Sequence, residues 1–278
     1  MSTRVVVLLS GGGAKAAAHV GALRALTEAG LAPAQIVGTS MGAVMGACYA
    51  SGLGPDEILA RVEAVGTKGI VRAPWSPVAG LWLHSLLRGE PLRDGIAALL
   101  PARSFTELKV PLLVTAVDLD SGALIRFGPG GEGAPLLDAL WASCALPVFY
   151  PPVLIGGRRL VDGGLRGVVP FAASADIPAD LTVAVDVGPG FDEPLAAAAT
   201  YPPLVSLHND TTGVLMAALT AAELARWRAE PGRPELLYVR PKVERSATFR
   251  VDRAREYAAE GHRATAAALA ARDARARS

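Results

Sequence analysis

The chain is poor in the residues that build metal sites, disulfide frameworks and nucleic-acid surfaces. Its 278 residues include only two cysteines and four histidines, with no CxxC pair and no cluster of histidines. We therefore expect no metal site, and we expect Cys48 and Cys144 to be small buried thiols. The formal net charge is +1, without the basic excess that nucleic-acid binding needs, so we expect no nucleic-acid partner.

Long apolar runs are also missing. The most apolar stretch, Leu136 to Ile155, is interrupted by Pro147, Pro151 and Pro152 and does not suit a membrane-spanning helix. The apolar run from Val5 to Leu9 is too short for the central region of a signal peptide. We expect a cytoplasmic protein whose contact with a membrane is at most peripheral.

What the chain does contain favours one closely packed α/β domain over 1–278. Hydrophobic residues make up 51% of it and charged residues 19%, which is a globular profile. An apolar run over 4–9, typical of a strand covered on both faces, precedes a helical pattern over 16–29 and a second β-like run over 35–37. This βαβ beginning predicts a parallel sheet with its loops gathered at the carboxyl ends of the strands.

A serine lies where the second predicted strand meets a helical pattern over 41–49, in the pentapeptide Gly38-Thr39-Ser40-Met41-Gly42. This is the context of a nucleophile elbow, in which a sharp turn exposes the serine and the flanking glycines leave space for the backbone. The positive end of the helix would lie beside an oxyanion formed there. The alternative is an N-capping serine in a glycine-rich turn.

A second glycine-rich loop, Ser10-Gly11-Gly12-Gly13-Ala14-Lys15, follows the first predicted strand and should lie at the same sheet edge as Ser40. It is not a phosphate loop, because Ala16 stands where Ser or Thr is needed. A dinucleotide fingerprint would fit the glycine spacing, but the second strand lacks the acidic residue that holds a ribose. We favour an oxyanion hole formed by backbone N–H groups over a turn that serves only packing.

The third motif is Val161-Asp162-Gly163-Gly164, an aspartate at the end of a short predicted strand. An Asx-turn without a catalytic duty is the alternative interpretation. The glycine loop, the serine pentapeptide and Asp-Gly-Gly, in that order and each at a strand end, arise together by chance far less often than any one of them. Their conjunction is the evidence for an enzyme.

A serine nucleophile also needs a base. In the order serine, acid, histidine, the base would be His208 or His262, but neither lies in an evident loop. His19 follows the glycine loop within the predicted helix, and we expect it to pack against the turn. The residues alone leave open whether Asp162 or a histidine is the base.

These motifs, extended by His19-Val20-Gly21 and by the stretch Ala142 to Val153, resemble the patatin-like phospholipase family. The resemblance covers about residues 4–190, and the predicted strand and helices of 191–278 resemble the tail of small bacterial members. It implies a three-layer α/β/α sandwich with a mostly parallel central sheet. Phospholipid, or another lipid ester, is the implied substrate.

The resemblance implies a Ser–Asp dyad without histidine and without a metal or organic cofactor. Ser40 would be the nucleophile and Asp162 the base, and ester hydrolysis would pass through an acyl-serine. The oxyanion hole would be formed by Gly11, Gly12 and Gly13, and Lys15 would organise their loop. The supporting glycines would be Gly38, Gly42, Gly163 and Gly164. The alternatives are a Ser–His–Asp esterase and a non-catalytic lipid-binding or regulatory protein that retains the fold.

Two features depart from the pattern or lie outside it. Ala16 replaces a glycine common in the family, and Gly167 and Val168 stand where asparagine is frequent, which bears on loop support and substrate range. The stretch 67–93 has a loose, apolar pattern, and the charge over 61–93 is +3 from five basic and two acidic residues. We interpret it as core under a long loop, with a mobile lid as the alternative.

Overall fold

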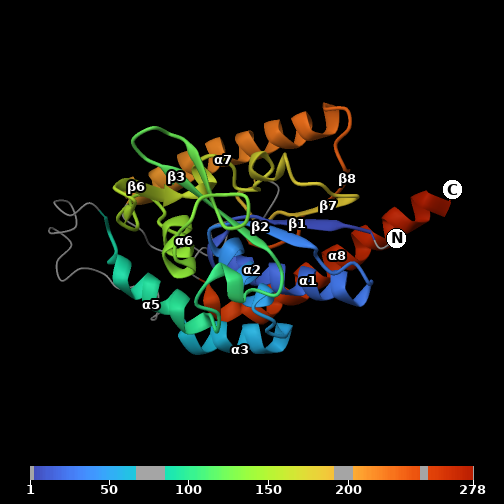
Figure 1. Ribbon diagram of the computed structural model, residues 1–278, viewed down its shortest axis with the longest axis horizontal. Helices are drawn as coiled ribbons and strands as arrows, with labels where there is room; N and C mark the ends of the chain where they lie inside the picture. The colour runs from blue at the N-terminus through green and yellow to red at the C-terminus, as the bar shows by residue number, and fades with distance from the viewer. Residues whose placement is uncertain (1–2, 67–84, 191–202, 245–249, 278) are drawn as a thin grey trace.

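An eight-stranded sheet forms the middle layer of the computed structural model, which describes residues 3–66, 85–190, 203–244 and 250–277 (Figure 1). The strands are β1 Val5–Leu9, β2 Gln35–Thr39, β3 Leu112–Asp118, β4 Leu124–Phe127, β5 Val153–Ile155, β6 Arg158–Asp162, β7 Leu181–Val185 and β8 Glu235–Val239. The helices are α1 Ala17–Glu28, α2 Met41–Ala50, α3 Pro55–Val65, α5 Gly89–Leu99, α6 Leu136–Ser143, α7 Pro203–Ala229 and α8 Ala254–Arg277. Short 3₁₀ turns lie at Gly13–Ala16, Phe105–Glu107, Gly163–Leu165, Ala172–Ser174 and Val251–Arg253.

The sheet is mostly parallel, as the sequence predicts. Hydrogen-bonded pairs link the strands in the order β5–β6–β3–β2–β1–β7–β8, and β4 also pairs with β3. The five strands from β3 to β8 along this path are parallel, whereas β4 and β6 run antiparallel to β3. Strands β3 and β4 therefore form a hairpin.

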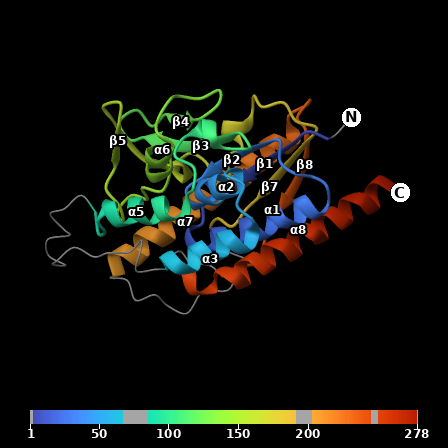
Figure 2. The same cartoon turned by 60° about the horizontal axis from the view of Figure 1, so that its bottom comes forward.

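Successive side chains of the central strands point to opposite faces of the sheet and pack into two hydrophobic cores. In β1, Val5, Val7 and Leu9 enter the larger core, whereas Val6 and Leu8 enter the smaller one. Figure 1 shows α1, α2, α3 and α8 on one face of the sheet and α7 on the other, and Figure 2 shows α1, α3 and α8 side by side. Because both faces of the strand are covered, its sequence is continuously apolar, and the three-layer sandwich that we expected is confirmed.

The last helix packs tightly against the first. A Cβ on Gly21 of α1 would lie 1.8 Å from the carbonyl oxygen of Ala258, and one on Gly261 of α8 would lie 1.9 Å from that of Ala18. The two backbones therefore touch where each helix has a glycine. The C-terminal part of the chain thus belongs to the same core as the first strand.

Among the described residues, no helix is both long enough and apolar enough to span a bilayer. Of the segment 67–93, which we considered as a lid, residues 67–84 lie outside the described residues. The end of that segment pairs with another loop, because the N–H groups of Leu86 and Leu87 donate to the carbonyls of Val148 and Phe149.

Candidate active site

Strands β2 and β6 run in opposite directions along β3, and each ends opposite one of two neighbouring residues of β3. Thr39, the last residue of β2, is opposite Thr115, and Asp162, the last residue of β6, is opposite Ala116. Strand β4 pairs with both Thr115 and Ala116 on the other edge, so β2 and β6 share one edge of β3. The end of β6 therefore meets the end of β2 where Ser40 begins the turn into α2.

Ser40 occupies the sharp turn that its pentapeptide predicts. Its φ of 54° lies in the left-handed region, which a residue with a side chain adopts only under constraint. A Cβ on Gly38 would lie 2.4 Å from Ala43 Cα, and one on Gly42 would lie 2.3 Å from the Ser10 carbonyl oxygen. Both flanking glycines are therefore required by close backbone contacts.

The backbone N–H of Ser40 donates to Ser143 Oγ over 2.8 Å. Ser143 is the last residue of α6 and is fully buried. A buried N–H without an acceptor is costly, so this hydroxyl holds the strained turn in place. Sequence reasoning assigned Ser143 no role, although it belongs to the stretch Ala142 to Val153; a buried serine ending an apolar helix was the available signal.

Asp162 is buried, with 4% of its surface exposed. Its Oδ1 accepts a hydrogen bond of 2.8 Å from the Gly164 N–H, and the nearby Ser40 side chain also favours the ionised carboxylate. Burial outweighs these two contributions and raises the pKa of Asp162 from 3.8 to about 6. A carboxylate of this kind is ionised at neutral pH and more basic than an exposed one.

Tight packing sets the path of the chain after Asp162. A Cβ on Gly163 would lie 2.3 Å from Thr115 Oγ1, so this position has no space for a side chain. The Thr115 hydroxyl in turn is hydrogen-bonded to that of Thr39 at 2.8 Å. The two strand ends are therefore joined below the site by side chains as well as by β3.

The thiol of Cys144 also lies at this site, which the sequence did not reveal. It interacts with the Ser40 hydroxyl and with the charge of Asp162, and burial raises its pKa well above the ordinary value. The thiol is therefore protonated and a poor nucleophile. Both cysteines are free and buried, as expected.

The glycine loop lies beside Ser40. A Cβ on Gly11 would be 3.3 Å from Ser40 Cβ, and one on Gly12 would be 2.8 Å from the Val187 carbonyl oxygen. The Gly11 N–H donates to the Val168 carbonyl at 3.0 Å. This N–H is therefore engaged with Val168, and the space beside Ser40 depends on the missing side chain of Gly11. Among the described residues, the N–H groups of Gly12 and Gly13 donate to no backbone carbonyl.

Buried polar side chains link the glycine loop to the segment that follows β7. Lys15 is 4% exposed, and its Nζ donates to the Gly188 carbonyl at 3.4 Å. The Gly188 N–H donates to Asp186 Oδ1 at 2.8 Å, and Asp186 also accepts hydrogen bonds from Tyr238 and Arg240. The segment after β7 thus links β8 to the glycine loop, a contact that sequence reasoning did not find.

Two of the histidines, His19 and His262, have other partners. His19 Nε2 donates to the Ser10 carbonyl at 2.8 Å, and burial lowers the pKa of His19 to about 4, so its ring is neutral. It packs against the turn, as predicted. His262 of α8 pairs with Glu28 of α1 at 2.6 Å. In the described parts of the chain, no three His, Cys, Asp or Glu side chains are grouped so that they could hold a metal ion.

The backbone at the two departures, 167 and 168, contacts neighbouring segments. The Gly167 carbonyl accepts a hydrogen bond from Thr39 Oγ1 at 3.4 Å, and the Val168 carbonyl accepts the one from Gly11. The loop after Asp162 is therefore linked to the end of β2 and to the glycine loop. Ala16 is buried at the end of its 3₁₀ turn.

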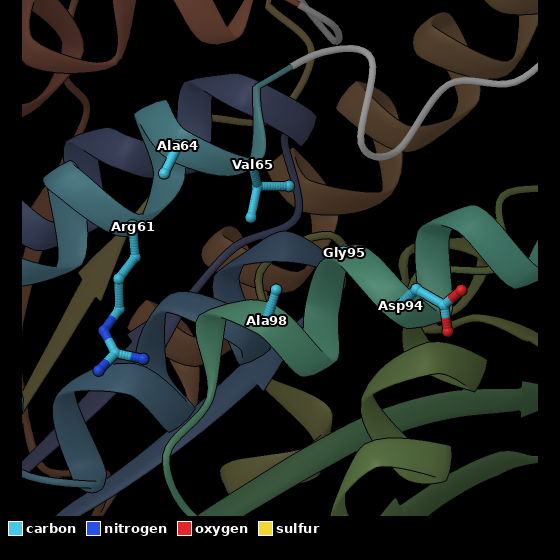
Figure 3. A pocket seen from close by; sticks show the side chains of 6 residues that line it. All are labelled: Arg61, Ala64, Val65, Asp94, Gly95 and Ala98. Carbon is cyan, nitrogen blue, oxygen red and sulfur yellow. The ribbon is translucent and has the colours of Figure 1, made fainter.

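A separate hollow of about 400 Å³ lies between α3 and α5 (Figure 3). It is lined by Arg61, Ala64, Val65, Asp94, Gly95 and Ala98. None of these is a candidate site residue. The hollow is therefore not the place where Ser40 and Asp162 meet.

Comparison with known proteins gives matches of sequence and of structure. The family model described as "Patatin-like phospholipase" matches residues 7–174. An uncharacterised NTE family protein of Mycobacterium tuberculosis is 35% identical over 188 residues, which are 67% of this chain and 49% of that protein. The uncharacterised protein YqhO of Bacillus subtilis is 33% identical over 59% of this chain and 64% of its own length.

The chain spans about half the length of the mycobacterial relative. Among solved structures, VipD from Legionella pneumophila matches with a TM-score of 0.49 and 15% identity, over 98% of this chain and 67% of that one.

Proposed function

The chain belongs to the patatin-like phospholipase family, and we propose that it is a serine acyl hydrolase that cleaves an ester bond of a phospholipid or another lipid. The observation that supports this most directly is the meeting of the strand ends that carry Ser40 and Asp162, where Ser40 interacts with the buried carboxylate. A nucleophile beside a base is what acyl transfer through a covalent intermediate requires.

In the first step, Ser40 Oγ attacks the ester carbonyl while its proton passes to Asp162. The carbonyl oxygen becomes an oxyanion, for which we propose the N–H groups of Gly12 and Gly13 and the positive end of α2 as the stabilising groups. The carbon–oxygen bond to the leaving alcohol then breaks, and the protonated Asp162 returns the proton to that alcohol. The products of this step are an acyl-serine and an alcohol, such as a lysophospholipid.

In the second step, Asp162 takes a proton from a water molecule as the water attacks the acyl-serine. The second oxyanion collapses, the bond from the carbonyl carbon to Ser40 Oγ breaks, and the proton returns to Ser40. A fatty acid leaves, and the dyad is restored. One carboxylate therefore acts as base and acid in turn.

The position of Asp162 suits this role. A carboxyl with a pKa near 6 is mostly ionised at pH 7 and is a stronger base than one near 4. The bonds of His19 to Ser10 and of His262 to Glu28 favour the dyad over a histidine-based triad. Because the proposed substrate is a lipid, peripheral contact with a lipid aggregate belongs to the same proposal.

The test is release of fatty acid from a panel of phospholipids, lysophospholipids and short esters. We expect Ser40→Ala and Asp162→Asn each to lower kcat by at least about a thousandfold with the fold intact. Two matched controls remove similar groups elsewhere. Ser174→Ala deletes a buried serine hydroxyl that donates to Phe171, and Asp118→Asn changes a carboxylate that holds the turn after β3.

Labelling with a fluorophosphonate separates the proposal from a non-catalytic protein of the same fold. Such a probe reacts with an activated hydroxyl, so we expect mass spectrometry to find the adduct on Ser40 and to find none in Asp162→Asn. A protein that labels nowhere and hydrolyses no ester of the panel would be a lipid-binding or regulatory member of the family. Loss of activity in His208→Ala or His262→Ala would instead favour the triad.

A further inference from the structure

The outer face of α7 is apolar along most of its length. Four large side chains are exposed to water: Leu204 at 74%, Leu207 at 60%, Val214 at 50% and Leu215 at 71%. Toward the C-terminal end, the exposed residues of this face are alanines, Ala218, Ala221, Ala222 and Ala225. Among the described exposed residues from 204 to 225, Asp210 is the only charged one.

The opposite face of the same helix is already occupied. Met216 reaches within 3.5 Å of where a Cβ on Gly164 would lie, next to Asp162. Further along, Leu224 and Trp227 pack into the smaller core, where the Trp227 ring centroid is 5.5 Å from that of Phe171. Helix α7 therefore has two apolar faces. One packs against the sheet, and the other contacts no part of the described chain.

The spacing of the exposed residues is that of a helix–helix seam. Positions 204, 207, 211, 214, 218, 221 and 225 follow steps of three and four, and all of them are exposed. This is the a and d spacing at which one helix packs against another over several turns. The stripe, with Leu215 and Ala222 beside it, runs for about 30 Å at 1.5 Å per residue.

The area of this stripe matches that of a functional patch. The four large side chains alone expose on the order of 500 Å², within the roughly 300–600 Å² of the largest apolar patch on a typical monomer, which is often a functional surface. With the alanines and the flanks of the helix, the area approaches the roughly 800 Å² per partner of a standard protein interface. The stripe is therefore large enough to hold a partner by itself.

Size varies along the stripe in a way that makes it complementary to itself. Its N-terminal half carries leucines and its C-terminal half carries alanines. If two copies of α7 lie antiparallel with Val214 beside Leu215 of the second copy, Leu207 faces Ala222, and Leu204 faces Ala225. Large side chains then meet small ones in these layers, which is how helices pack without gaps.

We propose that the outer face of α7 is the interface with a second copy of this chain, related by a two-fold axis near Val214. A two-fold interface requires a surface that is complementary to itself, and the gradient from leucine to alanine provides it. Antiparallel helices also place their dipoles in opposition, which is favourable. An anionic lipid surface is the weaker occupant, because no Lys or Arg lies between 203 and 225.

This inference goes beyond the proposed function, because it requires neither Ser40 nor Asp162 to be active. The test is sedimentation equilibrium of the full chain from about 1 to 100 µM. We expect a mass of twice 28.6 kDa at the upper end. Leu207→Glu and Ala222→Lys should each raise the dissociation constant of the dimer at least tenfold, since each buries two charges, one on each copy, without opposite charges.

The double variant Leu207→Glu with Ala222→Lys tests the register. In the antiparallel arrangement each new Glu meets a new Lys, so we expect the dimer to return to within about threefold of the wild type. Leu154→Glu is the matched control, because Leu154 is 72% exposed but lies on β5. Circular dichroism checks the fold of each variant, and all of these positions are exposed.

Three results would overturn the inference. The first is a wild-type chain that remains a single copy at 100 µM. The second is a dimer that Leu207→Glu leaves unchanged or that the double variant fails to restore. The third is a single-copy chain that binds vesicles of phosphatidylcholine and loses that binding in Leu207→Glu, which would assign the stripe to lipid. Ester hydrolysis measured on the same samples is independent of each result.

Discussion

Ser143 Oγ accepts a hydrogen bond from the backbone N–H of Ser40, and the two residues come from different helical segments, 103 positions apart. The bond fixes the backbone of a residue whose φ of 54° is unfavourable for a side chain. Helix α6 thus holds the turn from which the proposed nucleophile projects. Ser143 is a positioning residue, because it acts on the backbone of Ser40 and not on the reacting atoms.

Ser143→Ala should slow acyl transfer without weakening substrate binding. A buried N–H without an acceptor costs about 1–3 kcal/mol, so we expect kcat to fall about tenfold or more while KM stays within about twofold. The rate of fluorophosphonate labelling at Ser40 should fall in parallel. Ser174→Ala, which removes an equally buried hydroxyl bonded to Phe171, should leave both rates unchanged. Equal effects of the two variants would contradict the role of Ser143.

The pH profile should report the carboxyl of Asp162. The base must be ionised, and burial raises its pKa to about 6, so kcat/KM should rise tenfold per pH unit below 6 and level off above it. Burial also raises the pKa of Glu223 on α7, to about 7. Glu223→Gln is the control, and we expect its profile to match the wild type. If the rise of kcat/KM with pH were lost in Glu223→Gln, the titrating group would be Glu223 and not Asp162.

Removing the negative charge of Asp162 should stabilise the fold at neutral pH. The pKa of this carboxyl is 3.8 in an exposed setting and about 6 in the folded chain, so the native state binds more protons between these values. The free energy of unfolding therefore falls as pH rises through this window and remains lower above it.

Asp162→Asn escapes that loss, so its advantage over the wild type should reach up to about 3 kcal/mol at pH 7.5 and shrink toward pH 4. Urea unfolding at the two pH values measures it. An Asn variant that is less stable than the wild type at pH 7.5 would show that the carboxylate contributes more through its bonds than burial costs.

The two kinds of glycine near Ser40 should respond differently to alanine. In Gly42→Ala the new methyl would lie 2.3 Å from the Ser10 carbonyl oxygen, so we expect the free energy of unfolding to fall by more than about 3 kcal/mol. In Gly11→Ala the methyl would lie 3.3 Å from Ser40 Cβ, so we expect kcat to fall at least about tenfold with a smaller loss of stability. Thermal unfolding and ester hydrolysis separate the two effects.

Gly54→Ala serves as the control for both variants. Its Cβ would meet no atom within 4 Å, and its φ of −72° suits any residue. We therefore expect wild-type activity and stability within about 0.5 kcal/mol. If Gly42→Ala were as stable as Gly54→Ala, the close contact between α2 and the end of β1 would not be what fixes glycine there.

The sequence predicted the elements that depend on local patterns. The apolar run of β1 and the glycines around Ser40 are each determined by neighbouring residues, and the structure has them where expected. The last helix, α8, continues to Arg277, because the alanines and arginines near its end favour a helix without an apolar stripe.

The features that sequence analysis missed depend on residues far apart in the chain. Cys144 lies at the dyad only because α6 ends beside β6, and Ser143 meets Ser40 for the same reason. The support of Lys15 by Gly188 requires β7 and β1 to be neighbours, which a single sequence does not specify. The engaged N–H of Gly11 likewise depends on the carbonyl of Val168.

The meeting of β2 and β6 on one edge of β3 makes the spacing of nucleophile and carboxylate a property of strand register. Because side chains alternate along a strand, deleting one residue between Arg158 and Asp162 would turn the carboxylate toward the opposite side of the sheet. Residues could be added at the Gly156-Gly157 turn without that consequence, since the turn lies outside the paired segment. Anyone who transplants this chemistry to another scaffold would have to move three aligned strands, since the short motifs alone do not encode their alignment.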